Sequence, residues 1–448
     1  MTALPDAVIG DARTSTFGWE LLTDLADIGS RMAGHEGEAR GAERVREAFE
    51  SAGLADPRIE AFEIPGWWRE RAELTITEPI ERTHGGPHEV IALPGSPSGT
   101  VETELIDLGA GGYDAFADRG DELEEAIVMV SSETPETADR WIHRMEKYSN
   151  AANAGAAAFV FRNHIEGGVP PTGEVGYNNR PGPIPAVGVS REIGARLARL
   201  AGDGLEVRVE SVCRNEPATS RNVAARVGPE PGDRPAVLVT AHVDGHDVGD
   251  GALDNAAGSA VVAEVGRLLS GLEGELNHPV QLVTFGSEEI GLRGAYRWVE
   301  THDREEIKCV VNVDGAGSSR NLRVNANGFD ALEETFRAAT DAFDAPLSTS
   351  STVSPHGDQW AFVQEGIPAA MTGSTSESSG RGWGHTHADT LDKLDSRDLR
   401  EIATLVAEGV YRLADASVDV HGRSREEIEE SIPEGYVTEL KTGDRWPY

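Results

Sequence analysis

Three apolar stretches of the sequence are each followed closely by a histidine or a carboxylate. They span residues 236–239, 280–285 and 309–313, lengths that suit buried strands. The polar residues that follow them are, in order, His242 with Asp244, Glu288 with Glu289, and Asp314. Because ligands bind at the carboxyl ends of parallel strands in open α/β sheets, we expect these side chains to meet at one edge. Imidazole nitrogens and carboxylate oxygens are zinc ligands, so the pattern predicts a zinc site.

A glycine-rich turn, GALDNAAG, adds Asp254 to this set. It lies between a predicted strand and a predicted helix from Ser259 to Leu269, where its carboxylate is well placed to be shared by two metal ions. A shared carboxylate sets two such ions roughly 3.5–4 Å apart. Asp244 lies two residues after His242, on the same side of an extended chain. It can therefore accept the other imidazole N–H and orient the ring.

The adjacent residues Glu288 and Glu289 are expected to have different roles. In a non-helical turn neighbouring side chains diverge, so one can bind metal while the other faces a metal-activated water. Zinc lowers the pKa of such a water toward about 7. A nearby carboxylate can then take the proton and pass it to a leaving amine.

The segment GWGHTHADTLDKLD, residues 382–395, offers two candidates for a further ligand, His385 and His387. We prefer His385, because the residues after it can anchor it, with Asp389 and Thr390 starting the next helix. His387 is then a residue at the rim of the site.

Other polar residues near these motifs are interpreted as structural. His246, Asp247 and Asp250 are expected to be solvated loop groups. His356 and Asp358 are expected to be loop residues, with lining of a substrate pocket as the alternative.

The charge of the chain restricts its partners. Its 448 residues include 77 Asp and Glu against 40 Lys and Arg, for a formal net charge of −37. Such a surface repels itself, and concentrated salt screens the repulsion, so we hypothesise a cytoplasmic protein from a salt-rich interior. An ordinary acidic protein is the alternative. Nucleic acid and anionic membranes are not expected partners.

Targeting segments and disulfides are not expected either. The start, MTALPDAVIGDARTS, lacks the basic and apolar regions of a signal peptide. No apolar run reaches the roughly 18 residues that a membrane-spanning helix needs. Cys213 and Cys309 lie far apart without CxxC spacing and are interpreted as reduced and structural. The oligomeric state stays open.

The pattern of elements predicts an α/β fold with an insertion. Helical periodicity near the start and strands followed by helices from about residue 222 favour a mainly parallel sheet flanked by helices. Short strands and helices between these parts form a small, β-rich module. The predicted divisions are 1–88 and 213–421 for the main domain, 89–212 for the inserted module, and 422–448 for an acidic tail without a clear apolar period.

Four segments carry a resemblance to a known family: HVDGHDVGDGALDNAAG, TFGSEEIGLRGA, NVDGAG and GHTHADTLDKLD. They resemble the signatures of the co-catalytic di-zinc exopeptidases (metallopeptidase clan MH), which include leucyl aminopeptidases, aminopeptidase Y and plasma glutamate carboxypeptidase. The first loop is most similar to the carboxypeptidase-type branch. The module containing NAANAGAAAFVF resembles a protease-associated (PA) domain. One departure is Gln359, which stands where the family commonly has a histidine.

The resemblance implies a zinc exopeptidase fold and hydrolysis of terminal peptide bonds, with peptides as substrates. By this resemblance, His242 and Asp314 would bind one zinc ion, Glu289 and His385 would bind the other, and Asp254 would bridge the two. Glu288 would be the general base, and Asp244 would be the carboxylate that supports a ligand. Cobalt or manganese could replace zinc at such ligands. Whether the amino or the carboxyl end of the peptide is cut stays open.

Two functions of other classes remain as alternatives. One is a non-catalytic relative in which the PA module binds proteins, and the complete set of ligands disfavours it. The other is a glutaminyl cyclase-type transferase on the same scaffold, against which the PA-like insertion argues mildly.

Overall fold

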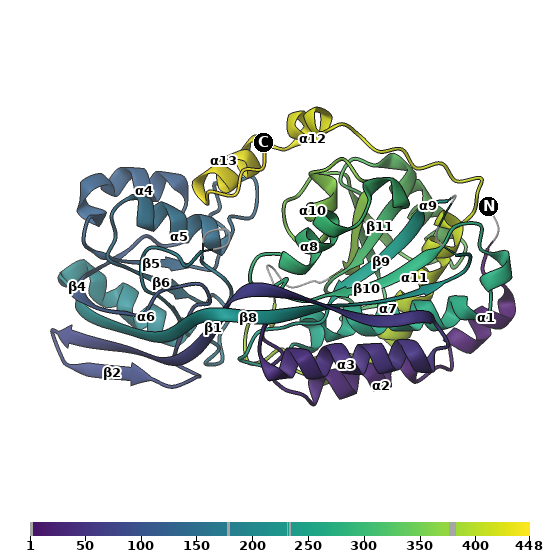
Figure 1. The fold of residues 1–448 in the computed structure, drawn as a ribbon. Coiled ribbons are helices and arrows are strands. Elements are labelled where there is room, and N and C mark those ends of the chain that lie inside the picture. Colours follow the sequence, from purple (N-terminus) through teal and green to yellow (C-terminus); the bar gives the residue numbers. More distant parts are fainter. Residues whose placement is uncertain (1–2, 177–179, 231, 233, 376–381) are drawn as a thin grey trace.

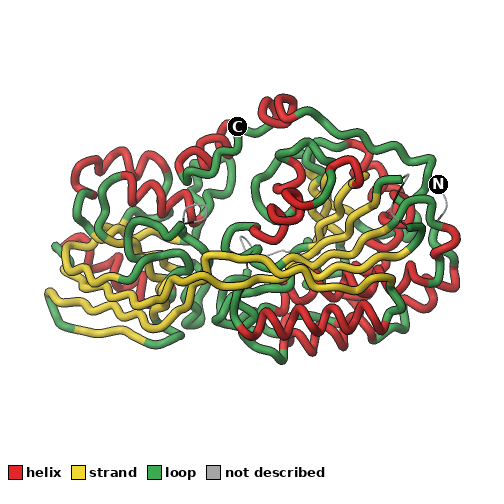
Figure 2. Tube along the Cα trace, in the orientation of Figure 1, coloured by secondary structure: helices red, strands yellow, loops and turns green. Residues whose placement is uncertain are grey.

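The computed structural model describes residues 3–176, 180–230, 232, 234–375 and 382–448, which form two lobes (Figure 1). A ribbon of two long strands, β1 (Ala55–Glu78) and β8 (Glu206–Val227), runs through both lobes and pairs antiparallel along most of its length. Figure 2 shows the strands as a continuous band from one lobe to the other. Because β8 is unbroken, the predicted division at 212/213 falls inside a strand.

The sheet of the larger lobe has four parallel strands at its centre, in the order β14, β11, β9, β10. On one side β8 pairs antiparallel with β10, and on the other β12 pairs antiparallel with β14 and parallel with β13. Strands β9 and β11 are buried along nearly their whole length, as expected for parallel strands covered on both faces. The bounds are β9 (Ala236–His242), β10 (Val280–Phe285), β11 (Ile307–Val313), β12 (Leu322–Asn325), β13 (Leu347–Ser350) and β14 (Ala369–Ser374).

Helices cover both faces of this sheet. In Figure 1, α2, α3 and α7 lie below the strands, and α8 and α10 lie above them. One hydrophobic core holds the sheet and its helices together. The helices of this lobe are α1 (Asp6–Ala12), α2 (Phe17–Ala26), α3 (Glu36–Ser51), α7 (Ala257–Ser270), α8 (Arg293–Thr301), α9 (Asp330–Asp341), α10 (Gln359–Val363) and α11 (Ser396–Leu413).

The smaller lobe has a core of its own, made from its strands and helices. Its strands follow the order β8, β4, β5, β6, β7, β3, in which the neighbours from β4 to β7 are parallel. A short strand, β2 (Arg82–Gly85), pairs with β1. The other elements are β3 (Val90–Ala92), β4 (Gly99–Asp107), β5 (Ile127–Ser131), β6 (Ala158–Arg162), β7 (Ala186–Val189), α4 (Tyr113–Arg119), α5 (Arg144–Asn153) and α6 (Arg191–Leu200).

The C-terminal segment, for which the sequence showed no clear apolar period, carries two helices, α12 (Arg425–Ser431) and α13 (Glu434–Thr442). Two of its apolar side chains, Ile428 and Leu440, are buried and pack into the hydrophobic core. Helix α13 packs against α5 of the smaller lobe (Figure 1). The expected tail is therefore a packed connection between the lobes.

The predicted fold class is confirmed: a mixed, mainly parallel sheet between helices, with an inserted smaller module. In the described ranges, no helix combines the length and the apolar character needed to cross a membrane.

Candidate metal centre

The predicted side chains meet where three neighbouring strands end. Strand β9 ends at His242, β10 ends at Phe285 shortly before Glu288, and β11 ends at Val313 just before Asp314. Because β9 lies between β10 and β11 and is parallel to both, the three ends lie at the same edge of the sheet. The predicted convergence follows from this topology.

One group of possible ligands consists of His242, Asp254 and Asp314, whose ligand atoms all lie within 4.8 Å of one another. His242 Nε2 is 3.2 Å from Asp254 Oδ1 and 4.0 Å from Asp314 Oδ1. His242 is buried, and the two carboxylates are partly buried. We call these three residues the strand-end group.

A second group consists of His246, Glu289 and His385, also with ligand atoms within 4.8 Å of one another and all buried. Glu289 Oε2 lies 3.1 Å from His385 Nε2 and 2.8 Å from His246 Nε2. The other oxygen of Asp254, Oδ2, is 3.2 Å from His385 Nε2. Asp254 therefore faces one group with each oxygen. We call His246, Glu289 and His385 the loop group.

The loop that carries Asp254 is held from two sides. The carboxylate of Asp389 accepts the N–H groups of Leu253 and Asp254 at 2.8 and 3.0 Å. The side chain of Asn255 donates to the carbonyl of Val313 at 2.9 Å, which ties the loop to the end of β11. The expectation that Asp389 starts the next helix is wrong.

The next helix begins later. Helix α11 has Asp395 as its N-cap, with the side chain accepting the N–H of Arg397. Thr390 makes no capping bond to the short helical turn at Leu391–Lys393. Asp389 is therefore available to fix the loop of Asp254 instead.

Asp244 supports the turn that carries the two glutamates. Its carboxylate oxygens accept the N–H of Glu288 at 3.1 Å and of Glu289 at 3.2 Å. Its Oδ1 lies 3.6 Å from His242 Nδ1, which is too long for a hydrogen bond, while its backbone carbonyl lies at 3.2 Å from that nitrogen. The carboxylate thus positions the glutamates, and its main-chain oxygen is the nearer partner of the imidazole.

The charges at the centre are concentrated and buried. Burial raises the pKa of Glu288 well above its ordinary value, and the nearby Glu289 and Asp358 raise it further. Burial alone would raise the pKa of Glu289, but His246 and His385 outweigh it and hold that pKa below its ordinary range. Burial likewise opposes ionisation of Asp254, but the adjacent imidazoles of His242 and His385 hold its pKa well below the usual value.

The residues fit a zinc centre. Among the described residues, His242 Nε2 and Glu289 Oε1 are buried atoms that make no hydrogen bond. Buried polar groups are normally paired, so nitrogen and oxygen atoms left in this way suit a cation that they would ligate. Carboxylates packed at this density also need positive charge to offset their repulsion.

Two residues of the smaller lobe contact His385 of the metal centre. The N–H of Thr172 donates to the carbonyl of His385 at 2.8 Å, and His385 Nδ1 lies 3.3 Å from the carbonyl of Thr172. Arg144 Nη1 is 3.4 Å from the same ring nitrogen. A carbonyl at Nδ1 keeps the proton there and leaves Nε2 to face the ligands. Sequence reasoning missed Thr172 and Arg144, because both lie more than 200 positions from His385.

Of the two histidines in the GWGHTHADT segment, His385 lies in the centre and His387 lies outside it. His387 Nε2 is 2.9 Å from Nδ1 of His88, on the exposed side. The assignment of His385 as the ligand stays a prediction.

The expectation of solvated groups in the loop after β9 is wrong for two residues. His246 is buried within the loop group. Asp247 forms an ion pair with Arg69 of β1 at 2.7 Å, and both side chains are largely buried. Asp250 is only partly buried, and its backbone carbonyl accepts a hydrogen bond from Arg31.

Asp358, in the segment 356–359, is close enough to the centre for its charge to interact with His242 and Glu289. Asp358 is fully buried, and neither of its carboxylate oxygens makes a hydrogen bond in the part of the chain described. Gln359, which replaces the family's histidine, is buried and accepts from Asn312 at 3.2 Å. His356 lies 3.5 Å from Glu439 of the C-terminal segment.

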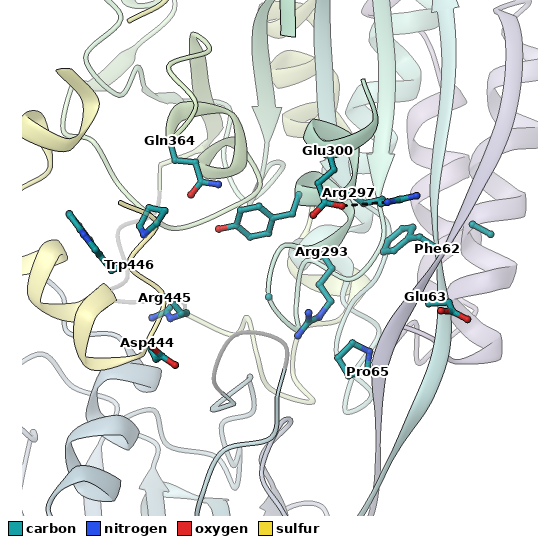
Figure 3. Close-up of a pocket in the computed structure, with 14 residues that line it drawn as sticks. Phe62, Glu63, Pro65, Arg293, Arg297, Glu300, Gln364, Asp444, Arg445 and Trp446 are labelled. Atoms are coloured by element: carbon teal, nitrogen blue, oxygen red, sulfur yellow. Dashed lines mark hydrogen bonds and ion pairs between the residues drawn. The ribbon is translucent and has the colours of Figure 1, made fainter. Parts of the chain in front are cut away.

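A cavity of about 700 Å³ adjoins the turn after Glu289, because Gly291 is part of its wall. Figure 3 shows Arg445 and Trp446 of the C-terminal segment on one side and Arg293 of α8 with Phe62 of β1 on the other. Cavities that bind small ligands have volumes of roughly 300–1,000 Å³. The cavity is therefore large enough for part of a peptide.

Comparisons with known proteins found peptidases similar to this chain. Residues 222–410 match the model for peptidase family M28, and residues 101–197 match the model for the PA domain. Aminopeptidase YwaD of Bacillus subtilis is 27% identical over 88% of this chain and 83% of its own. Carboxypeptidase Q of Bos taurus is 24% identical over 91% of this chain and 87% of its own.

Solved structures share the fold. A peptidase M28 precursor from Shewanella amazonensis has a TM-score of 0.78 and 22% identity, covering 93% of this chain and 97% of that one. BSAP, described as a zinc aminopeptidase from Bacillus subtilis, has a TM-score of 0.70 and 24% identity, covering 89% and 94%. The arrangement of both lobes thus occurs in solved peptidase structures.

Proposed function

Because the chain belongs to peptidase family M28 and carries a PA domain, we propose that it is a zinc-dependent exopeptidase that hydrolyses terminal peptide bonds. Two of the relatives named above are, by name, an aminopeptidase and a carboxypeptidase, and both kinds of enzyme are exopeptidases. The main observation behind the proposal is that the strand-end group and the loop group lie side by side, with one oxygen of Asp254 near His242 and the other near His385. Peptides are its substrates.

We propose that the centre holds two zinc ions. His242 and Asp314 would hold one ion, Glu289 and His385 the other, and Asp254 both. Supporting this, the two oxygens of Asp254 lie 3.2 Å from His242 and 3.2 Å from His385. When bound, zinc ions make water a nucleophile near neutral pH and polarise the carbonyl to be attacked.

Glu288 is the general base in this proposal. It takes a proton from the attacking water and passes it to the nitrogen of the leaving amine. Its backbone N–H is held by Asp244, which supports a fixed position for the side chain. Because burial raises its pKa, the Glu288 carboxylate is a stronger proton acceptor than an exposed glutamate. We assign the rest of the peptide to the cavity lined by Arg293 and Arg445.

The experiment is an assay of aminoacyl-anilides, of dipeptides and of N-blocked dipeptides in concentrated salt, with and without a chelator. We expect turnover to stop on chelation and to recover when zinc is added. Turnover that a chelator leaves unchanged would contradict the proposal. Anilides require a recognised free amine, so their turnover identifies an aminopeptidase, whereas N-blocked dipeptides identify a carboxypeptidase.

The two alternatives are not favoured. A non-catalytic binding protein would not need Glu288 beside the ligand groups, and the similar proteins described above are peptidases. The glutaminyl cyclase-type alternative predicts cyclisation of peptides that begin with glutamine, and the same samples can be assayed for that product.

We also propose that the protein works in a salt-rich cytoplasm. The net charge of −37 supports this, because salt screens the repulsion between the carboxylates. Unfolding from low to multimolar KCl tests it. We expect stability to rise with salt, and maximal stability in dilute buffer would contradict the proposal.

A further inference from the structure

His246 is a buried histidine to which the proposed zinc ligation assigns no role. It lies in the loop after β9, 5% exposed. Nδ1 makes no hydrogen bond within the described residues, and Nε2 faces a carboxylate oxygen of Glu289. A structural histidine in a core normally donates to a carbonyl or a carboxylate, since an unpaired buried polar group is costly. Nδ1 of His246 therefore lacks the partner that a structural histidine normally has.

The ring nitrogen points at an oxygen already assigned to zinc. His246 Nε2 lies 2.8 Å from Glu289 Oε2, and His385 Nε2 lies 3.1 Å from the same atom. The two imidazole rings meet edge to face, with centroids 4.4 Å apart. Donor atoms around one four-coordinate zinc ion, at bond lengths near 2.0–2.1 Å, stand about 3.3 Å apart. The two separations from Glu289 Oε2, 2.8 and 3.1 Å, are slightly shorter than this value.

The hollow between these side chains has the size of a single ion. It has a volume of about 10 Å³ and is lined by His246, Asp254, Glu289 and His385, together with the glycines and Thr386 around them. A space of this size holds about one water molecule or one small ion. Val248 and Asp389 complete the wall, so five of its side chains carry an imidazole or a carboxylate, and Asp389 already accepts the N–H groups of Leu253 and Asp254.

We propose that His246 is a fourth protein ligand of the zinc ion held by Glu289, His385 and Asp254. This inference rests on the proposed zinc centre and adds a ligand to it. The two ions are then unequal. The ion of the loop group has four protein ligands, the number typical of closed structural zinc sites. The ion of the strand-end group has three, from His242, Asp314 and Asp254, and keeps a position open for substrate.

The consequence is an ordered loss of metal. The ion with four protein ligands should be released last, and the ion with three should exchange first. The peptide would then bind to the ion of the strand-end group, which keeps an open position. The ion of the loop group would stay bound and contribute only its positive charge.

The experiment compares zinc binding by the full-length wild type, His246→Ala, His246→Gln and the control His387→Ala. His387 is a partly exposed histidine in the segment that carries His385, and it is paired with His88. Zinc is titrated into metal-free protein against a competing chelator, and cobalt-loaded samples are measured by visible absorption. For the tighter of two sites we expect both His246 variants to lose at least about 100-fold in affinity, beyond the usual effect of a residue that only orients a ligand.

Imidazole counting in the wild type gives a second measurement that requires no variant. X-ray absorption of the protein with two zinc ions should detect three imidazoles over the two ions. Two imidazoles over two ions, or unchanged affinity and cobalt spectra in the His246 variants, would overturn the role of His246 while leaving the zinc exopeptidase intact. A wild type that binds no zinc would overturn both proposals.

Discussion

The strand-end group and the loop group lie in the same centre but are positioned by different parts of the fold. His242 and Asp314 stand at the ends of adjacent strands, so the sheet sets their separation. His246 and His385 come from loops, and His385 is held by hydrogen bonds to Thr172 of the smaller lobe. The comparison suggests that the first group is as rigid as the sheet, whereas the second depends on how the lobes pack. Four predictions test this difference.

Replacing Asp254 should have the largest effect, because this residue serves both groups. In Asp254→Ala we expect weak binding of both ions and a loss of activity of roughly 10³-fold or more, since bound metal contributes several kcal/mol to the transition state. Zinc content and kcat/KM measure this. Asp250→Ala, in the same loop, is the matched control and should bind zinc normally. Retention of two ions by Asp254→Ala would remove the link between the groups.

Glu288→Gln should lower activity without lowering zinc binding, which distinguishes the general base from the metal ligands. Glutamine keeps the shape but cannot take a proton, so we expect kcat to fall by about 10²–10⁴-fold. Zinc content should stay at the wild-type value, because neither group contains this residue. A variant with normal kcat would exclude Glu288 as the base.

Arg144→Ala should affect the loop group alone. Arg144 donates to the carbonyl of Glu174 at 3.0 Å and lies beside His385, so its loss should loosen the segment that holds this ligand. We expect a drop of about 10–100-fold in affinity for one zinc ion and none for the other. Two-site zinc titration checks it, with the exposed Arg191→Ala of the same lobe as control. Equal weakening at both sites would show that the smaller lobe does not distinguish them.

His387→Ala should have the smallest effect. The residue is partly exposed and contacts His88 outside the centre. We expect the free energy of unfolding to change by no more than about 0.5 kcal/mol and zinc content to stay the same. If this variant lost an ion, His387 rather than His385 would be the ligand.

The strand-end group could be predicted from local patterns. An apolar stretch followed by His242 or Asp314 identifies a strand and its end, and the rule for parallel sheets brings such ends together. Asp254 followed in the same way from a glycine-rich turn between a strand and a helix. In each case the residues that set the position are neighbours in the sequence.

The loop group could be predicted only in part. His385 was preferred for the wrong local reason, since Asp389 holds the loop of Asp254 instead of starting a helix. His246 was expected in solvent, because nothing near it in the sequence indicates that Glu289 and His385 cover it. The C-terminal segment was misjudged in a similar way. Its Glu439 is buried, with Arg140 of the smaller lobe 3.4 Å away.

The amino-acid order alone thus specifies the strands, the carboxylates and histidines at their ends, and the acidic character of the surface. These follow from side-chain periodicity and charge, which act over a few residues. The inward position of His246, the hold of Thr172 on His385 and the packing of the C-terminal helices exist only in the folded chain. They depend on contacts between distant segments, and burial there changes which partners a polar side chain can have.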